Sequence, residues 1–402
     1  MDVPDCHGET EMSTKNRRLT LAAVALTLAA VAAVPLVIRA RGAASVDKVW
    51  GTPRAEIFDS PDMRGPLVAG DAVTYLPFVA ELKPGNRTHN VRLDIVAQEI
   101  EIAPEVRFQA WTFGGSVPGP VIHVREGDRV NFTLRNRSTD RVSVTEPDKS
   151  DAPFLQQLAA ADQQKARPLI APMHHSIDFH AATVAADDKW RMILPGQSIR
   201  FEFVANYPGV YMYHCGVPPV LQHVAMGQYG IVIVSPREGY DTDEEAATRY
   251  AVVQSEFYLK PGGANGLYEL DYEAALRKQP SHVVFNGHVK ALSDHPLMAK
   301  VGERVRLYFH NVGPNDQSST HVIGAIFDRV WYEGNPRNEM RGMQTVLVGS
   351  SNGAVLEFFV AEEGRYVLVD HEFADASKGA VGQIVATSRR GTLTLPSEPM
   401  QH

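Results

Sequence analysis

Hydrophobic and polar residues alternate along most of the chain after about residue 69, which is the pattern of β-strands that bury one face. In one such stretch Val130, Phe132 and Leu134 alternate with polar neighbours, after a turn at Glu126-Gly127-Asp128. Short alternating runs separated by turn residues are typical of sandwiches and barrels. The pattern therefore predicts an all-β protein.

Two sequence patterns occur twice, in the same order. Residues 126–136 (EGDRVNFTLRN) match residues 301–311 (VGERVRLYFHN), with Gly, an acid, Arg, Val and the final Asn in register. Residues 203–211 and 359–366 then share Phe-Val-Ala, Gly and Tyr. Two matches in one order indicate an internal duplication.

The duplication predicts two tandem Greek-key β sandwiches, at residues 69–235 and 249–390, joined by a charged linker over 236–248. The first copy carries an insertion at about 138–172. Within it the run SDAPFLQQLAAADQQKAR predicts a short helix in a long loop, either surface decoration or a lid or docking element. Residues 391–402 are expected to be a C-terminal tail.

Residues 19–38 form a segment of twenty residues without a charge, with Lys and Arg on both flanks. As a helix, this length spans about 30 Å of hydrocarbon. Residues 1–42 are therefore predicted to be a membrane anchor or an export signal, and Arg17-Arg18 fits a twin-arginine signal. Residues 43–68 are expected to be a linker. Both alternatives place the remainder in the periplasm or elsewhere outside the cytoplasm.

Composition adds one feature to this picture, an excess of histidine. The 402 residues include 15 His but 2 Cys, Cys6 and Cys215, so a disulfide framework is excluded. The net charge of −8, without a long basic run after the N-terminal region, argues against a nucleic-acid partner. The histidines instead indicate metal binding.

Side-chain alternation along strands sorts the candidate metal ligands into two sets. His175 and His180, five residues apart, point to opposite faces, and so do the neighbours His214 and Cys215. One face collects His175, Cys215 and His223. Two imidazoles and a thiolate are the ligand set of a blue-copper electron-transfer site.

Each set requires one more ligand. A weak axial ligand from Gln228 or Met226 would complete the first set. The second set, His180 and His214, needs a third imidazole to hold a metal with an open position, and His371 of the second copy supplies it.

The second copy itself keeps no blue-copper set. In the repeat alignment Asp370 stands opposite Cys215. The segment Thr320-His321-Val322-Ile323-Gly324 aligns with the strand that carries His175, but it brings no cysteine partner. We therefore expect one blue-copper site per chain.

These segments give the chain a clear resemblance to the copper-containing dissimilatory nitrite reductases, two-domain cupredoxin enzymes. The resemblance covers about residues 69–390, where HxxDFHAA, YHCG, THVIG and DH follow in family order. It implies two tandem cupredoxin-like sandwiches and two coppers per chain. The implied ligands are His175, Cys215 and His223 for the type 1 copper and His180, His214 and His371 for the type 2 copper.

The resemblance also implies an activity and an assembly. Nitrite is reduced to nitric oxide by one electron that enters at the type 1 copper and passes through Cys215-His214 to the type 2 copper. Asp178 and His321 would donate protons, and Ile323 would shape the nitrite pocket. The family is a homotrimer, in which His371 would come from the neighbouring subunit. A small cupredoxin or a cytochrome c would donate the electron.

One position departs from the family pattern. Where the family has its axial methionine, five residues after His223, this chain has Gln228. We favour Gln228 as the axial ligand, with Met226 as the alternative. An amide oxygen is a stronger and harder donor than a thioether, so it should lower the potential of the type 1 copper.

Two other copper functions share part of this pattern. A two-domain, laccase-like multicopper oxidase has the same blue-copper set, but it builds a trinuclear cluster from several His-x-His pairs, which this chain lacks. A non-catalytic cupredoxin electron carrier would not need Asp178, His321 or an open site with three histidines. Nitrite reduction is therefore the preferred interpretation.

Overall fold

The computed structural model describes residues 48–388, apart from 61, 83, 86, 139–140, 144–169, 247 and 263. The predicted apolar helix at 19–38, the predicted helix within the insertion and the C-terminal tail all lie outside the described residues. Within the described part, no helix has the length and apolar character needed to cross a membrane.

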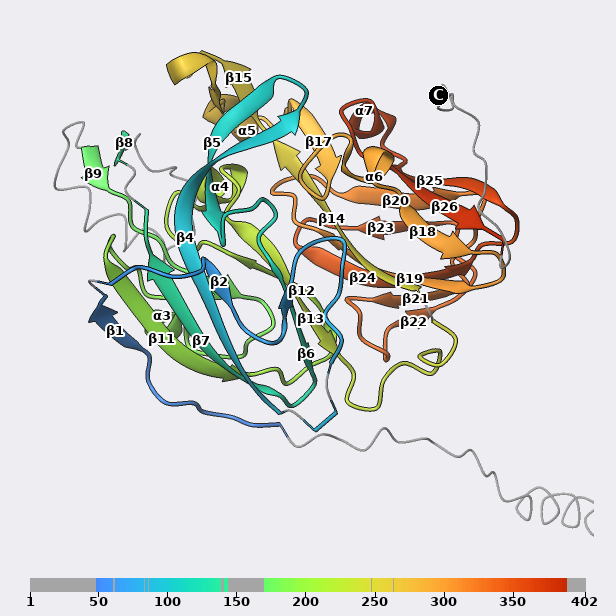
Figure 1. Cartoon of the computed structure of the whole chain (residues 1–402), viewed down its shortest axis with the longest axis horizontal. Coiled ribbons are helices and arrows are strands. Elements are labelled where there is room, and N and C mark those ends of the chain that lie inside the picture. Colours follow the sequence, from blue (N-terminus) through green and yellow to red (C-terminus); the bar gives the residue numbers. More distant parts are fainter. Residues whose placement is uncertain are drawn as a thin grey trace, which may run out of the picture. The chain divides into compact units, whose positions relative to one another are not determined.

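The first sandwich consists of two facing sheets (Figure 1). Its strands are β1 (Glu56–Asp59), β2 (Val68–Ala69), β3 (Val73–Thr74), β4 (Thr88–Ala103), β5 (Val106–Phe113), β6 (Val121–Arg125), β7 (Arg129–Asn136), β10 (Asp178–Phe179), β11 (Gln197–Val204), β12 (Gly209–His214) and β13 (Tyr229–Ser235). One sheet contains β1-β11-β7-β4-β5, with β2 paired to β4, and the other has the order β10-β12-β13-β6-β3. A separate pair, β8 (Arg141–Ser143) and β9 (Ile170–Pro172), lies at the two ends of the insertion.

The second sandwich is formed by the C-terminal half. Its strands are β14 (Thr248–Phe257), β17 (His282–Phe285), β18 (Leu297–Lys300), β19 (Arg304–Asn311), β20 (Ser318–Ile323), β21 (Arg329–Tyr332), β22 (Glu339–Met340), β23 (Thr345–Val348), β24 (Asn352–Phe359), β25 (Gly364–Asp370) and β26 (Val381–Thr387). The two sheets have the orders β17-β14-β19-β24-β21-β22 and β18-β26-β25-β20-β23.

The two sandwiches have matching topologies. In the first, β7 pairs antiparallel with β11 and parallel with β4, and β19 pairs in the same way with β24 and β14 in the second. In the facing sheets, β10-β12-β13-β6 corresponds to β20-β25-β26-β18. The repeated sequence patterns therefore lie on equivalent strands, and the predicted all-β fold of two tandem cupredoxin-like sandwiches is confirmed.

In the part of the chain that the structure describes, the helices are short and lie in connections. They are α3 (Ala186–Lys189), α4 (Val220–Ala225), η1 (Ala264–Gly266), α5 (Tyr272–Leu276), α6 (Ala291–Asp294) and α7 (Phe373–Ala376). Helix α4 carries His223 and leads into Gly227, whose φ of +107° favours glycine. This turn returns the chain to the end of β12, where the carbonyl of Gln228 accepts the N–H of Cys215 at 3.1 Å.

Two segments differ from the expected domain layout. Strand β1 lies in the region expected to be a linker, yet it pairs with β11 along its whole length. Its four residues show little alternation because it is an edge strand without a fully buried face. Strands β15 (Leu259–Pro261) and β16 (Tyr268–Leu270) follow β14 in the second half of the chain, yet β16 pairs with β5 of the first sandwich.

A shared apolar core joins the two sandwiches. It includes Val210 and Met212 from β12 together with Tyr308 from β19 and Val355 from β24. The backbones approach so closely that a side chain on Gly353 would lie 2.2 Å from the carbonyl oxygen of Val210. The strand that leads to the candidate copper ligands is therefore held between its own sheet and the second sandwich.

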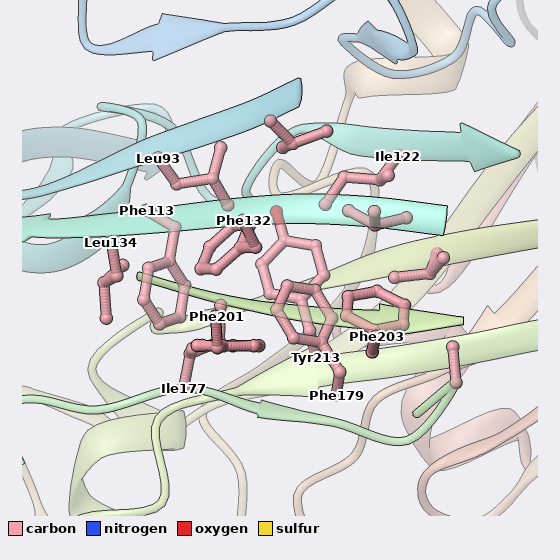
Figure 2. Packing of buried hydrophobic residues seen from close by; sticks show 14 of the residues in the cluster. Leu93, Phe113, Ile122, Phe132, Leu134, Ile177, Phe179, Phe201, Phe203 and Tyr213 are labelled. Carbon is pink, nitrogen blue, oxygen red and sulfur yellow. The ribbon is translucent and has the colours of Figure 1, made fainter. Parts of the chain in front are cut away.

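Aromatic packing fixes the short strand β10 inside the first sandwich (Figure 2). The ring of Phe179 lies 4.8 Å from that of Phe132, 5.1 Å from that of Phe203 and 5.5 Å from that of Tyr213, all measured between centroids. Phe179 is fully buried and stands between Asp178 and His180 in the sequence. Its burial therefore determines where these two polar side chains emerge.

We predict that Phe179→Ala lowers the free energy of unfolding by about 3–5 kcal/mol, because it opens a cavity among rings that cannot all close over it. Urea denaturation followed by fluorescence measures the change. Phe78, with 65% of its surface exposed, is the control, and Phe78→Ala should alter stability by less than about 0.5 kcal/mol. Equal effects of the two substitutions would contradict the packing described.

Candidate copper centres

The first group of candidate ligands lies in the core of the first sandwich, beside the end of β12. His175, Cys215 and His223 are all buried, and their ligand atoms lie within 4.8 Å of one another. The Sγ atom of Cys215 is 3.3 Å from Nδ1 of His223 and 4.0 Å from Nδ1 of His175. The structure thus brings together the three residues predicted for the type 1 copper.

Burial sets the protonation of this group. It lowers the pKa of His223 to about 4 and that of His175 well below the usual value, so both imidazoles are neutral near pH 7 with a free lone pair. Burial also raises the pKa of the Cys215 thiol to about 11, so a metal that binds here must displace a proton. This donor set suits a soft, thiolate-binding metal such as copper.

Of the two candidate axial residues, Gln228 is the one aimed at the ligand atoms. It is fully buried, and its Oε1 atom lies 3.0 Å from Nδ1 of His223. Its Nε2 atom is buried without a hydrogen-bond partner in the structure. Met226 is only partly buried and packs in the core shared by the two sandwiches. The geometry favours Gln228, and its role as axial ligand stays a prediction.

Two neighbours of this group were not identified from the sequence. The Trp111 ring lies 4.9 Å from the His223 ring and 5.9 Å from the His175 ring, measured between centroids. The backbone N–H of Ser176 points at Cys215 Sγ over 3.5 Å, and its Oγ accepts the N–H of Gly216 at 3.1 Å. Trp111 comes from the opposite sheet, where no spacing rule connects it to the ligands.

The second group lies on the other side of the same strands, near the surface. Asp178, His180 and His214 each offer an atom within 4.8 Å of the others. Nε2 of His180 and Nε2 of His214 are 3.1 Å apart, and Asp178 Oδ2 is 3.8 Å from the latter. Nδ1 of His214 donates to the carbonyl oxygen of Cys215 at 2.8 Å, so its Nε2 keeps the lone pair that a metal needs.

Asp178 has the features of a proton donor beside this pair. Burial raises its pKa, while the neighbouring His214 acts in the opposite direction. Its Oδ1 atom is buried without a hydrogen-bond partner in the structure. An unpartnered carboxyl oxygen beside two imidazoles fits a site that receives a further group.

Three more predicted residues lie on the second sandwich, near one another. The rings of His321 and His371 are 5.1 Å apart between centroids. Nδ1 of His321 donates to the carbonyl oxygen of Gln344, which the sequence did not single out, so Nε2 is the ring nitrogen left for other partners. His371 is exposed, and Ile323 has 38% of its surface exposed.

The structure of one chain does not bring His371 into the second group. Among the described residues, the two groups that could hold a metal are the ones given above, and neither contains His321 or His371. One chain therefore presents two half-sites, a pair of imidazoles with Asp178 on the first sandwich and a pair of imidazoles on the second.

The fold and these groups define the class of protein, a two-domain copper protein built from cupredoxin sandwiches. Models of the multicopper oxidase family match residues 94–146 and 167–238. A multicopper oxidase of known structure is 24% identical, with a TM-score of 0.59 over 76% of this chain and 92% of its own, and shares the fold.

More similar proteins identify the family. The chain is 39% identical to the copper-containing nitrite reductase of Neisseria meningitidis serogroup A, over 73% of this chain and 68% of the relative. It is 32% identical to that of Cereibacter sphaeroides, over 89% and 91%. The structure of the copper nitrite reductase from Nitrosomonas europaea is 35% identical, with a TM-score of 0.60 over 75% of this chain and 94% of that one. The chain belongs to the copper-containing nitrite reductases.

We predict that Gln228→Met raises the reduction potential of the type 1 copper, because a thioether is a weaker and softer donor than an amide oxygen. Redox titration of the blue absorption of the copper-loaded protein measures the potential. Met226→Leu is the control and should leave the potential unchanged. The reverse outcome, with only Met226→Leu shifting the potential, would assign the axial position to Met226.

Proposed function

We propose that this protein reduces nitrite to nitric oxide, with nitrite, one electron and two protons giving nitric oxide and water. The observation that carries the proposal is the peptide link between His214 and Cys215. It joins a buried ligand set suited to electron transfer to an open, surface-facing set suited to substrate. Each set fits copper by its donor chemistry, imidazole and thiolate in one and imidazole in the other.

Copper bound at the two sets would supply the one-electron redox chemistry and a Lewis-acidic position for nitrite. The residues of the chain exclude water and connect the two sets. The buried set excludes water from Cys215, which is fully buried. His214 directly precedes Cys215 in the chain, so the electron has a short covalent route between the sets. This arrangement separates electron acceptance from substrate binding.

The two protons are assigned to Asp178 and His321. Asp178 lies beside His214, and its raised pKa favours the protonated form to higher pH than for an ordinary carboxyl group. His321 is fixed in orientation through Nδ1 and presents Nε2. Ile323, exposed two residues further along β20, would form an apolar wall of the nitrite pocket.

The half-sites support a homotrimer with a shared type 2 site. His180 and His371 are both exposed on the single chain, and each belongs to an incomplete set. In a cyclic assembly, the same pair of surfaces meets at every interface, so the His371 of one subunit can complete the His180-His214 pair of the next.

The environment and partners of the enzyme are further proposals. The uncharged segment at 19–38 supports a location outside the cytoplasm, with the chain either membrane-anchored or exported after cleavage. The net charge of −8 suits a basic electron donor, a small cupredoxin or a cytochrome c.

The rival copper functions have less support. A laccase-like oxidase requires a trinuclear copper cluster, and the described residues hold two candidate metal groups with at most three ligands each. A simple electron carrier has no use for Asp178 and His180 beside His214.

Anaerobic turnover tests the function. Copper-loaded protein with a reduced dye and nitrite should release nitric oxide, measured with an electrode, at a rate that depends on nitrite. Cys215→Ala is the control, and it should lose the blue colour and the turnover together. Protein that holds two coppers per chain and accepts electrons from the dye, yet yields no nitric oxide, would contradict the proposal.

Mixing two inactive variants tests the shared site. His214→Ala and His371→Ala should each lose type 2 copper and activity, and His371→Ala should keep the blue colour. When the variants are co-expressed, about a quarter of the interfaces in a random trimer combine an intact pair with an intact His371. The activity of the mixed trimers should therefore be about a quarter of the activity of the same amount of wild-type protein. No recovery in mixed trimers would show that each site is built within one chain.

A further inference from the structure

Asp370 is a fully buried carboxylate directly before the exposed His371. Its Oδ1 atom accepts the backbone N–H groups of Ser319 at 2.9 Å and Glu372 at 3.0 Å. Its Oδ2 atom accepts Nε2 of Gln254 at 2.7 Å. One side chain thus binds three donors from three segments, and two of these segments carry His321 and His371.

This carboxylate occupies the place of the copper-binding cysteine in the other sandwich. In the first sandwich the N–H of Ser176 points at Cys215 Sγ, and in the second the N–H of Ser319 points at Asp370 Oδ1. The strand registers agree, since Asp178 pairs with His214, the residue before Cys215, and His321 pairs with Val369, the residue before Asp370. The second copy has kept the geometry of the site and replaced its metal chemistry with hydrogen bonds.

The hydrogen bonds extend across three strands. Ser318 Oγ on β20 donates to Oε1 of Gln254 on β14 at 2.7 Å and lies 2.8 Å from Thr320 Oγ1. The N–H of His371 donates to the carbonyl oxygen of Ser319 at 2.9 Å. We call Asp370, Gln254 and Ser318 the polar clamp. All three residues are buried.

We propose that the polar clamp positions His321 and His371 for the type 2 copper site, with Asp370 as its central positioning residue. The inference rests on the proposed function, because it assumes that these two histidines face that copper. A buried carboxylate with all its donors in place holds one geometry, and its loss leaves three donors without acceptors. The polar clamp therefore fixes the backbone that carries the rings of His321 and His371, which lie 5.1 Å apart.

Hydrogen-bond geometry, rather than charge, carries this role. In Asp370→Asn the amide oxygen can still accept the N–H groups of Ser319 and Glu372. Gln254 can then rotate its amide, accept from the new Asn Nδ2 and donate to Ser318. In Asp370→Ala all three bonds to residue 370, from Ser319, Glu372 and Gln254, are lost.

The test compares Asp370→Ala with Asp370→Asn in copper-loaded, full-length protein. Asp370→Ala should bind type 2 copper about 10–100-fold more weakly and change its electron paramagnetic resonance signal, while the blue absorption is retained. Asp370→Asn should restore both type 2 properties. Neither measurement requires nitrite turnover, so the clamp is tested even if the proposed function fails.

Thr242→Ala is the matched control, because Thr242 is a buried hydrogen-bonding residue whose partners are Glu357 and Arg306. It should leave the type 2 copper unchanged. Wild-type copper affinity and signal in Asp370→Ala would overturn the proposal, and so would equal losses in Asp370→Asn. If Asp370→Ala does not fold, Gln254→Met decides: weaker type 2 copper with an altered signal supports the clamp, and wild-type values overturn it.

Discussion

Adjacent residues at the end of a β-strand point to opposite faces, and the structure depends on this constraint at one peptide bond. Where β12 ends, Cys215 turns into the core of the first sandwich and His214 turns towards the surface. The core supplies two neutral imidazoles and excludes water, while the surface supplies Asp178 and an incomplete set of ligands. Under the proposed function, the chain thus separates electron transfer from substrate chemistry and connects the two sites through one peptide bond. The packing of β12 against β24 and the turn at Gly227 both hold this strand end in place.

Duplication gave the protein two copies of this strand end, and they have diverged. The first copy keeps the thiolate, and the second has Asp370 in its place. The thiolate prepares a metal site, whereas the carboxylate organises the backbone beneath His371. In the proposed assembly, the site at the surface of one sandwich and the pair of imidazoles on the other meet only between neighbouring chains. On this account the second sandwich holds His321 and His371 in fixed positions for the type 2 site of a neighbouring subunit.

Much of this arrangement is visible in the sequence, because it follows from periodicity. The two-residue period assigned His175 and His180 to different faces, and the structure places them in different groups. Contacts between distant strands produce no periodic pattern in the sequence. The contact of Trp111 with His223 and that of Gln344 with His321 were therefore not predicted. Strand β1 was expected to be a linker because an edge strand shows little alternation. The hydrogen bonds of Asp370 depend on three strands meeting, which only the fold reveals.

The central claim is that the electron which reduces nitrite arrives through Cys215 and His214 at a site completed by His371. Rapid mixing of the dye-reduced, copper-loaded protein with nitrite tests it most directly. The blue absorption, bleached by reduction, should return as nitric oxide forms, with about one molecule released for each electron that the coppers of the protein lose, as a one-electron reaction requires. In His371→Ala the absorption should stay bleached over the same period. Recovery in His371→Ala at the wild-type rate would show that nitrite takes its electron by another route.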